Sequence, residues 1–118
     1  MQYRSDFAAP ILKALFRAVR DPRRSNLRTE GIEERDLALE AGILLPMEME
    51  LPKYANVKRG AIVRILELME KQGLIQFKDP VPGTLYKVLP TAEGESIAER
   101  LLRPWRQKLM DWLLGRSS

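Results

Sequence analysis

The feature that most constrains the fold is a change at Gly73 in the spacing of apolar residues along the chain. Before it, residues 56–72 carry apolar side chains three and four positions apart, as an amphipathic helix does. After it, Leu74–Lys78 and Leu85–Leu89 read as strands, separated by the turn-forming residues Asp-Pro-Val-Pro-Gly. The pattern therefore predicts a helix that is followed directly by a β-hairpin.

Three further helices are predicted around this unit. Asp6–Arg20 carries one apolar stripe, and Ile32–Ala41 is a shorter amphipathic segment with acids in its first turn. A last helix begins after Thr91, its expected N-cap, and runs from about Ala92 to Leu114. At 118 residues the chain is predicted to be a single α+β domain, mostly α, spanning 1–118.

The packing faces of the helices follow from the same periods. Residues 43–54, with two prolines, predict an extended connection or a short strand, after which Asn56 is expected to cap the central helix. The first helix is expected to bury Phe7, Ile11, Leu12, Leu15, Phe16 and Val19. The central helix is expected to bury Val57, Ala61, Ile65, Leu68 and Met69, with Ile62 and Leu66 widening the stripe.

The chain contains neither Cys nor His, and this excludes most catalytic chemistry. There is no thiolate metal site, no disulfide, no Cys nucleophile and no imidazole base. Carboxylates such as Glu33, Glu34 and Asp36 have no partner motif and are expected on a solvated face. We therefore expect a binding protein without enzymatic activity, cofactor or metal.

Charge alternates in blocks along the chain, although the net charge is only +4. Residues 13–28 hold six basic side chains and one acid, residues 30–50 hold seven acids and one base, and residues 53–78 are basic again. Such blocks are typical of solvated faces that pair within the molecule, or of a protein with one face for an anion. The sequence leaves both interpretations open.

Two motifs resemble the winged helix-turn-helix regulators. The stretch from Gly60 to Ile75, GAIVRILELMEKQGLI, is similar to their recognition helix and first wing strand, and Tyr86–Gly94, YKVLPTAEG, is similar to the segment after the wing. The spacing and the long last helix look most like the PadR type, and next the MarR type. The resemblance implies a winged helix with three helices, a β-hairpin wing and a long C-terminal helix.

The resemblance also implies contacts with double-stranded DNA. The N-terminal end of the recognition helix enters the major groove in such proteins, where arginine reads guanine and lysine neutralises phosphate. On this basis Lys58, Arg59 and Arg64 are the main candidates, with solvated charges paired with Glu67 or the acidic second helix as the alternative. Asn56 either contacts DNA or caps the helix. The further candidates are Lys78 and Lys87 beside the wing, and Arg23 and Arg24 as a phosphate clamp or a solubilising loop.

The C-terminal helix has more apolar surface than one small domain needs. Residues 92–116 are assigned to dimerisation, with packing against the first helix or a different protein partner as alternatives. The predicted dimer contacts are Ile97, Leu101, Trp105, Leu109 and Trp112.

The predicted function is therefore a small, cytoplasmic, dimeric transcriptional regulator that binds duplex DNA through residues 56–72. No segment is apolar over a length that spans a membrane, and we expect no membrane partner. The alternative is a winged-helix adaptor for protein–protein interaction, favoured by the weakly basic wing and the acidic segment 30–50. An acidic segment that neutralises the exposed face of the central helix would favour the adaptor.

Overall fold

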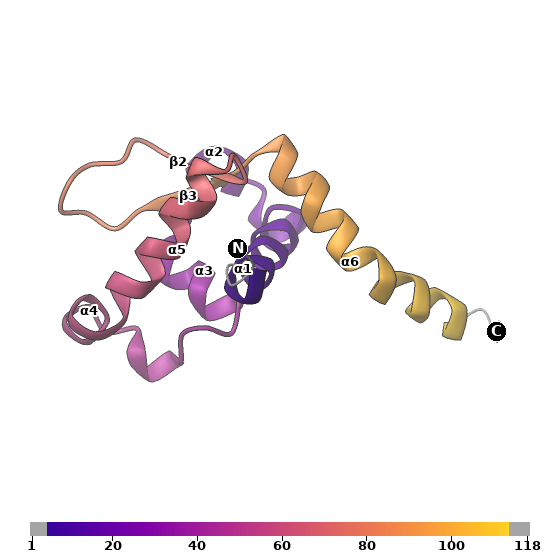
Figure 1. The fold of residues 1–118 in the computed structure, drawn as a ribbon, viewed down its shortest axis with the longest axis horizontal. Helices are drawn as coiled ribbons and strands as arrows, with labels where there is room; N and C mark the ends of the chain where they lie inside the picture. Colours follow the sequence, from indigo (N-terminus) through magenta and orange to yellow (C-terminus); the bar gives the residue numbers. More distant parts are fainter. Residues whose placement is uncertain (1–4, 114–118) are drawn as a thin grey trace.

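The computed structural model describes the backbone of residues 5–113 and the side chains of residues 8–102. Figure 1 shows α1 at the centre, with the other helices and a small sheet around it and α6 projecting to one side. The elements in chain order are α1 (Ser5–Val19), α2 (Leu27–Glu30), β1 (Ile32–Glu33), α3 (Glu34–Glu40), α4 (Leu51–Lys53), α5 (Arg59–Lys71), β2 (Ile75–Phe77), β3 (Lys87–Pro90) and α6 (Ala92–Leu113). The fold is α+β and mostly helical, as predicted.

The sheet has three antiparallel strands in the order β1-β3-β2. The hairpin β2–β3 is present as predicted, whereas β1 was not expected. Ile32 was assigned to a helix, but it pairs with Val88 of β3, and α3 begins only at Glu34. Because Val88 is fully buried at the centre of the sheet, the short strand β1 brings Ile32 into the same core. This layout is compatible with a winged helix.

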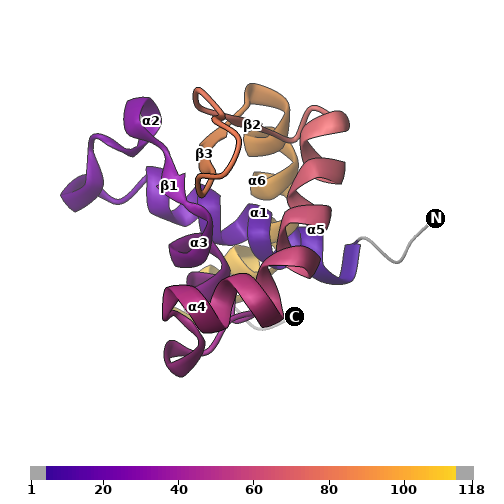
Figure 2. The same ribbon diagram turned by 90° about the vertical axis from the view of Figure 1, so that its left-hand side faces the viewer.

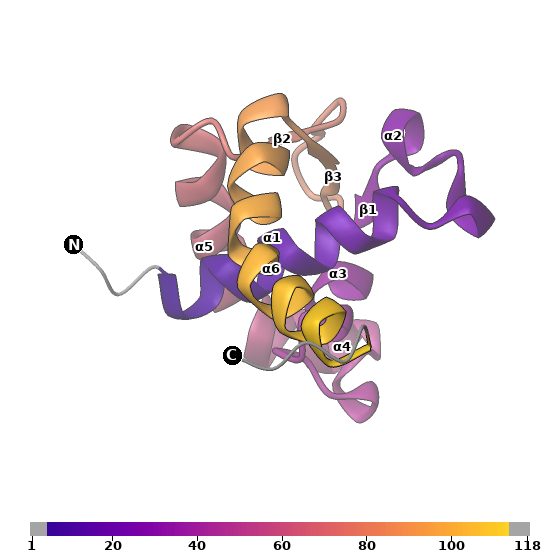
Figure 3. The same ribbon diagram turned by 90° about the vertical axis from the view of Figure 1, so that its right-hand side faces the viewer.

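Helix α1 supplies the centre of the hydrophobic core. Its predicted stripe is confirmed from Ile11 to Val19, all of whose apolar members are buried, and the side chain of Phe7 lies outside the described residues. Figure 3 shows the first turns of α6 crossing α1, so the N-terminal part of α6 closes one side of the core. Ala98 of α6 is fully buried there.

The central helix is longer than predicted and faces the core differently. Residues 43–54 form a 3-10 turn at Pro46–Glu48 and then α4, and a π-helical turn at Tyr54–Lys58 joins α4 to α5. Asn56 therefore lies inside the helical stretch and is not its N-cap. The segment expected to be an extended connection contributes the first turn of this helix.

The core face of this helix is built by Tyr54, Ile62, Leu66 and Met69. Val57 was expected to face inward, but 68% of it is exposed. It lies five residues before Ile62, which is about 140° around a regular helix, so both cannot face the same core. Ala61 is likewise exposed, while Ile65 and Leu68 are half-buried.

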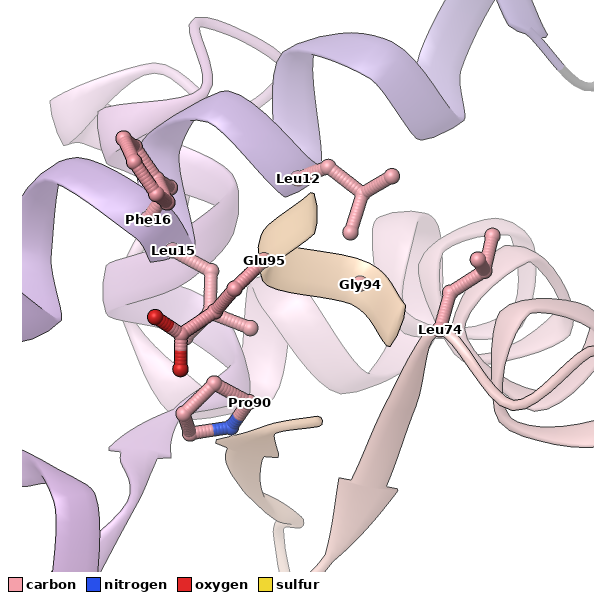
Figure 4. A pocket seen from close by; sticks show the side chains of 7 residues that line it. All are labelled: Leu12, Leu15, Phe16, Leu74, Pro90, Gly94 and Glu95. Carbon is pink, nitrogen blue, oxygen red and sulfur yellow. The ribbon is translucent and has the colours of Figure 1, made fainter. Parts of the chain in front are cut away.

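Thr91 joins the end of α5 to the start of α6. Its hydroxyl accepts a hydrogen bond from the Gly94 N–H at 2.9 Å, as a capping residue does, and donates one to the Gly73 carbonyl at 2.7 Å. The backbones approach closely here, and a Cβ on Gly94 would lie only 1.9 Å from the Leu74 carbonyl oxygen. Figure 4 shows Gly94 and Leu74 at this junction, together with Leu12 of α1.

Gly94→Ala is expected to lower the free energy of unfolding by about 3 kcal/mol or more, because α6 must move away from the Leu74 carbonyl. Gly60→Ala is the matched control, since a Cβ there meets nothing within 4 Å. It is expected to stabilise the protein by about 0.5–1 kcal/mol through helix propensity. Urea unfolding of both variants measures the difference, and equal effects would contradict the close approach at Gly94.

A pH-dependent link joins α2 to α6. The Arg28 guanidinium hydrogen-bonds the Glu95 carboxylate, with Nη1–Oε2 at 2.6 Å, and holds the pKa of Glu95 below its usual value of 4.5. A lowered pKa in the folded state stabilises the protein above the unfolded pKa, and this contribution is lost as the pH falls.

Glu95→Gln is therefore expected to be less stable than the wild type at pH 7, with the difference in stability narrowing below about pH 4.5. Thermal unfolding over a pH series measures this difference, and a difference independent of pH would contradict the link.

Candidate nucleic-acid interface

A buried carboxylate lies behind the helix that was predicted to contact DNA. Glu34, at the start of α3, is 0% exposed, and both of its oxygens accept two hydrogen bonds. Oε2 accepts from the Tyr54 hydroxyl at 2.5 Å and from Arg59 Nε at 2.9 Å. Oε1 accepts from the Tyr86 backbone N–H at 2.6 Å and from Arg59 Nη2 at 3.2 Å. The charge is therefore buried with both a countercharge and full hydrogen bonding.

Arg59 extends this cluster to the hairpin. Its Nη2 also donates to the Thr84 carbonyl at 2.9 Å, and the guanidinium lies 5.5 Å from the centre of the Tyr86 ring. That ring stacks on Phe77 of β2 with the ring centres 4.2 Å apart. Arg59 thus connects α3, the central helix and the β2–β3 loop, so their relative positions depend on one another.

The protonation states in this cluster follow from its contacts. Burial, and secondly the hydrogen bond to Glu34, raise the pKa of the Tyr54 hydroxyl above its usual value of 10.0. The hydrogen bond to Glu34 likewise raises the pKa of Arg59. Both shifts favour a neutral Tyr54 hydroxyl and a charged Arg59 guanidinium.

This geometry corrects one sequence prediction, because Glu34 was expected on a solvated face but is buried. For Arg59 the sequence left open a contact with a guanine edge or pairing with an acid, and the structure contains an ion pair with Glu34 of α3. Lys58 is also paired, with its Nζ 3.2 Å from Glu48. Acids from segment 30–50 therefore neutralise two of the three cations predicted to be the main contacts.

The outward face of the central helix keeps two cations. Arg64 is exposed and makes no ion pair within residues 8–102, and the same holds for Lys53 of α4. Asn56 is exposed between them, so its amide is open to a ligand. Beside Arg64, the surface is hollowed into a shallow groove lined by Ala55, Arg59, Gly60, Val63, Arg64 and Glu67. Lys53 was missed because its segment was expected to be a connection.

The two lysines beside the hairpin loop differ. Lys78 lies 3.4 Å from Glu30, whereas Lys87 is exposed and has no ion pair among the described side chains. The loop between them carries Pro80 and Val81 at exposed positions and, as the sequence indicated, little positive charge. Lys87 is thus the more available of the two for an anion.

The structure does not bring Arg23 and Arg24 to the central helix. Both lie in the turn Pro22–Arg24, where Arg23 pairs with Asp21 at 3.1 Å and Arg24 pairs with Glu40 at 2.7 Å. Figure 2 shows the end of α1 and the chain leading to α2 on one side of the domain and α5 on the other. These arginines and Arg64 therefore belong to different surfaces.

The predicted dimer contacts are described only in part. Ile97 is half-buried and packs against the core of its own chain, and Leu101 is 41% exposed. The side chains of Trp105, Leu109 and Trp112 lie outside the described residues. Dimerisation therefore stays a prediction.

The described residues contain no candidate metal site, since no group of three acids among them is placed to hold a metal ion. No helix among them has the length and apolar character needed to cross a bilayer. No protein-family model, curated protein or solved structure matches the chain. The case for a function therefore rests on the chain's own residues.

Arg59→Met is expected to lower the free energy of unfolding by about 3 kcal/mol, because it leaves the buried Glu34 without its countercharge. Arg64→Met removes the same charge from the same helix at an exposed position without an ion pair. It is expected to change stability by less than about 0.5 kcal/mol. Chemical unfolding of the two variants tests the cluster, which a similar loss in both would refute.

Proposed function

We propose that the protein is a winged-helix DNA-binding protein of the PadR type, a small dimeric regulator of transcription. In this proposal the helix formed by α4, the π-helical turn and α5 lies in the major groove of duplex DNA, and the β2–β3 loop is the wing. The helices α1, α3 and α5 and the strand order β1-β3-β2 support the assignment.

The outward face of the central helix is the observation that carries the proposal. Residues 51–66 contain four cations and no acid. Lys58 and Arg59 are paired with acids on neighbouring segments, which leaves Lys53 and Arg64 exposed on the side opposite the core. Two unpaired cations on one helix form a site for a polyanion, because each can displace a counterion from phosphate. Glu67 lines the groove beside Arg64.

The roles of the predicted contacts change in consequence. Lys53 and Arg64 are assigned to phosphate, with Lys87 as a further contact beside the wing. Arg59 is a positioning residue that holds the wing against the helix through Glu34 and the Thr84 carbonyl. Asn56 is assigned to a base edge rather than to capping, since it lies inside the helical stretch. Residues 92–116 are assigned to the dimer contact.

A second candidate is a protein–protein adaptor. Three large apolar side chains are exposed at the start of the central helix and just before it, Leu45, Met47 and Leu51, and 70% of Met47 is exposed. Exposed apolar clusters of this kind mark protein contacts. The neutralisation of Lys58 and Arg59 by Glu48 and Glu34 also favours this candidate.

Fluorescence anisotropy of a labelled random duplex of about 24 base pairs, from about 50 to 200 mM salt, separates the two candidates. Wild type is expected to bind, with an affinity that falls steeply as salt rises. The double variant Lys53→Ala with Arg64→Ala is expected to reduce the steepness of log K against log salt by about 1.8 per protomer, since each phosphate contact contributes about 0.9.

The matched control removes two cations from the other side of the domain, by Arg17→Ala with Arg23→Ala. It is expected to bind DNA as the wild type does. Equal losses in both double variants would show only a general attraction by net charge. Absence of binding at low salt would overturn the DNA-binding function in favour of the adaptor.

Sedimentation equilibrium tests the proposed dimer separately, and a monomer at all protein concentrations would refute the dimer.

A further inference from the structure

The outward face of the central helix differs chemically between its middle and its two ends, which carry the unpaired cations Lys53 and Arg64. Lys53 and Arg64 are eleven residues apart, which is about 16 Å along a helix. Between them the exposed positions are Ala55, Asn56, Val57, Gly60 and Ala61. The helix therefore has charge at its ends and an amide, small apolar side chains and bare backbone between them.

Val57 is exposed because of how the helix is anchored. Tyr54 and Ile62 both face the core, and the π-helical turn that begins at Tyr54 accommodates the extra residue between them. Val57 lies in that turn, on the far side of the helix from Ile62. Single π-helical turns are rare and occur often at functional sites, so an apolar side chain presented by one is a candidate contact.

Two neighbours define what this centre can recognise. Arg59, one of the two arginines of this helix and so one of its two groups suited to a guanine edge, is held by Glu34 on the inner side. Gly60 leaves the backbone open, since a Cβ there would meet nothing within 4 Å. A ligand surface can approach closely at this point, and it meets apolar and amide groups rather than positive charge.

We propose that this face distinguishes A·T from G·C base pairs in the major groove, with Val57 against the 5-methyl group of thymine and Asn56 on adenine. Thymine alone presents a methyl group in that groove, and an asparagine amide pairs with N6 and N7 of adenine. The inference rests on the proposed DNA-binding function and names the base pairs that the same site recognises.

Replacement of thymine by uracil tests the methyl contact, because it removes the methyl group alone. The test duplex is the one that wild-type protein binds most tightly after selection from a randomised pool. It is then synthesised in two forms, one with thymine and one with uracil at the same positions. Wild type is expected to bind the thymine duplex about fourfold more tightly for each methyl group contacted. The variant Val57→Ala is expected to bind the two duplexes equally.

Leu45→Ala is the matched control, since Leu45 is also an exposed apolar residue but precedes the central helix and is not assigned to DNA. It is expected to keep the preference of the wild type for thymine over uracil. The inference is overturned if wild type binds both duplexes equally, if Val57→Ala keeps the preference, or if the selected sites are G·C pairs throughout. In those three outcomes DNA binding itself stands, whereas absence of any selected duplex at low salt overturns the proposed function together with the inference.

Discussion

The buried carboxylate of Glu34 is the interaction on which the arrangement of the domain depends. It begins α3 and receives four hydrogen bonds, from Tyr54, from Arg59 twice and from the backbone of Tyr86. A charge with no exposed surface is tolerated only when such partners are all in place. Formation of this cluster therefore couples three segments that lie far apart in the sequence: α3, the central helix and the hairpin.

Similar pairing across the domain explains the charge blocks of the sequence. Acids of the segment 30–50 pair with cations of the two basic blocks, as in Glu40 with Arg24, Glu48 with Lys58 and Glu30 with Lys78. Six of the twelve cations in the two basic blocks are therefore paired with acids among the described side chains. Anion binding then depends on the unpaired cations, so their position matters more than the net charge of +4.

Local patterns predicted the local structure, and tertiary contacts decided the rest. The stripe of α1, the hairpin and the Thr91 cap were predicted because each depends on neighbouring residues. Strand β1 was not predicted, because the local pattern around Ile32 is that of a helix. Its strand conformation depends on pairing with Val88, which is distant in the sequence. The burial of Glu34 could not be predicted, because the sequence does not distinguish it from the neighbouring Glu33. Only the tertiary fold determines which of the two carboxylates is buried.

The same contacts link rigidity to recognition in the proposed complex. Because Arg59 is bound to Glu34 and to the hairpin loop, the helix and the loop are ordered before DNA arrives, and less conformational entropy is lost on binding. That arrangement also withdraws one of the two arginines of the central helix from its outward face. Recognition is then left to Asn56, Val57 and the backbone at Gly60, which are groups suited to A·T pairs. Pre-organisation and base preference would thus arise from one buried ion pair.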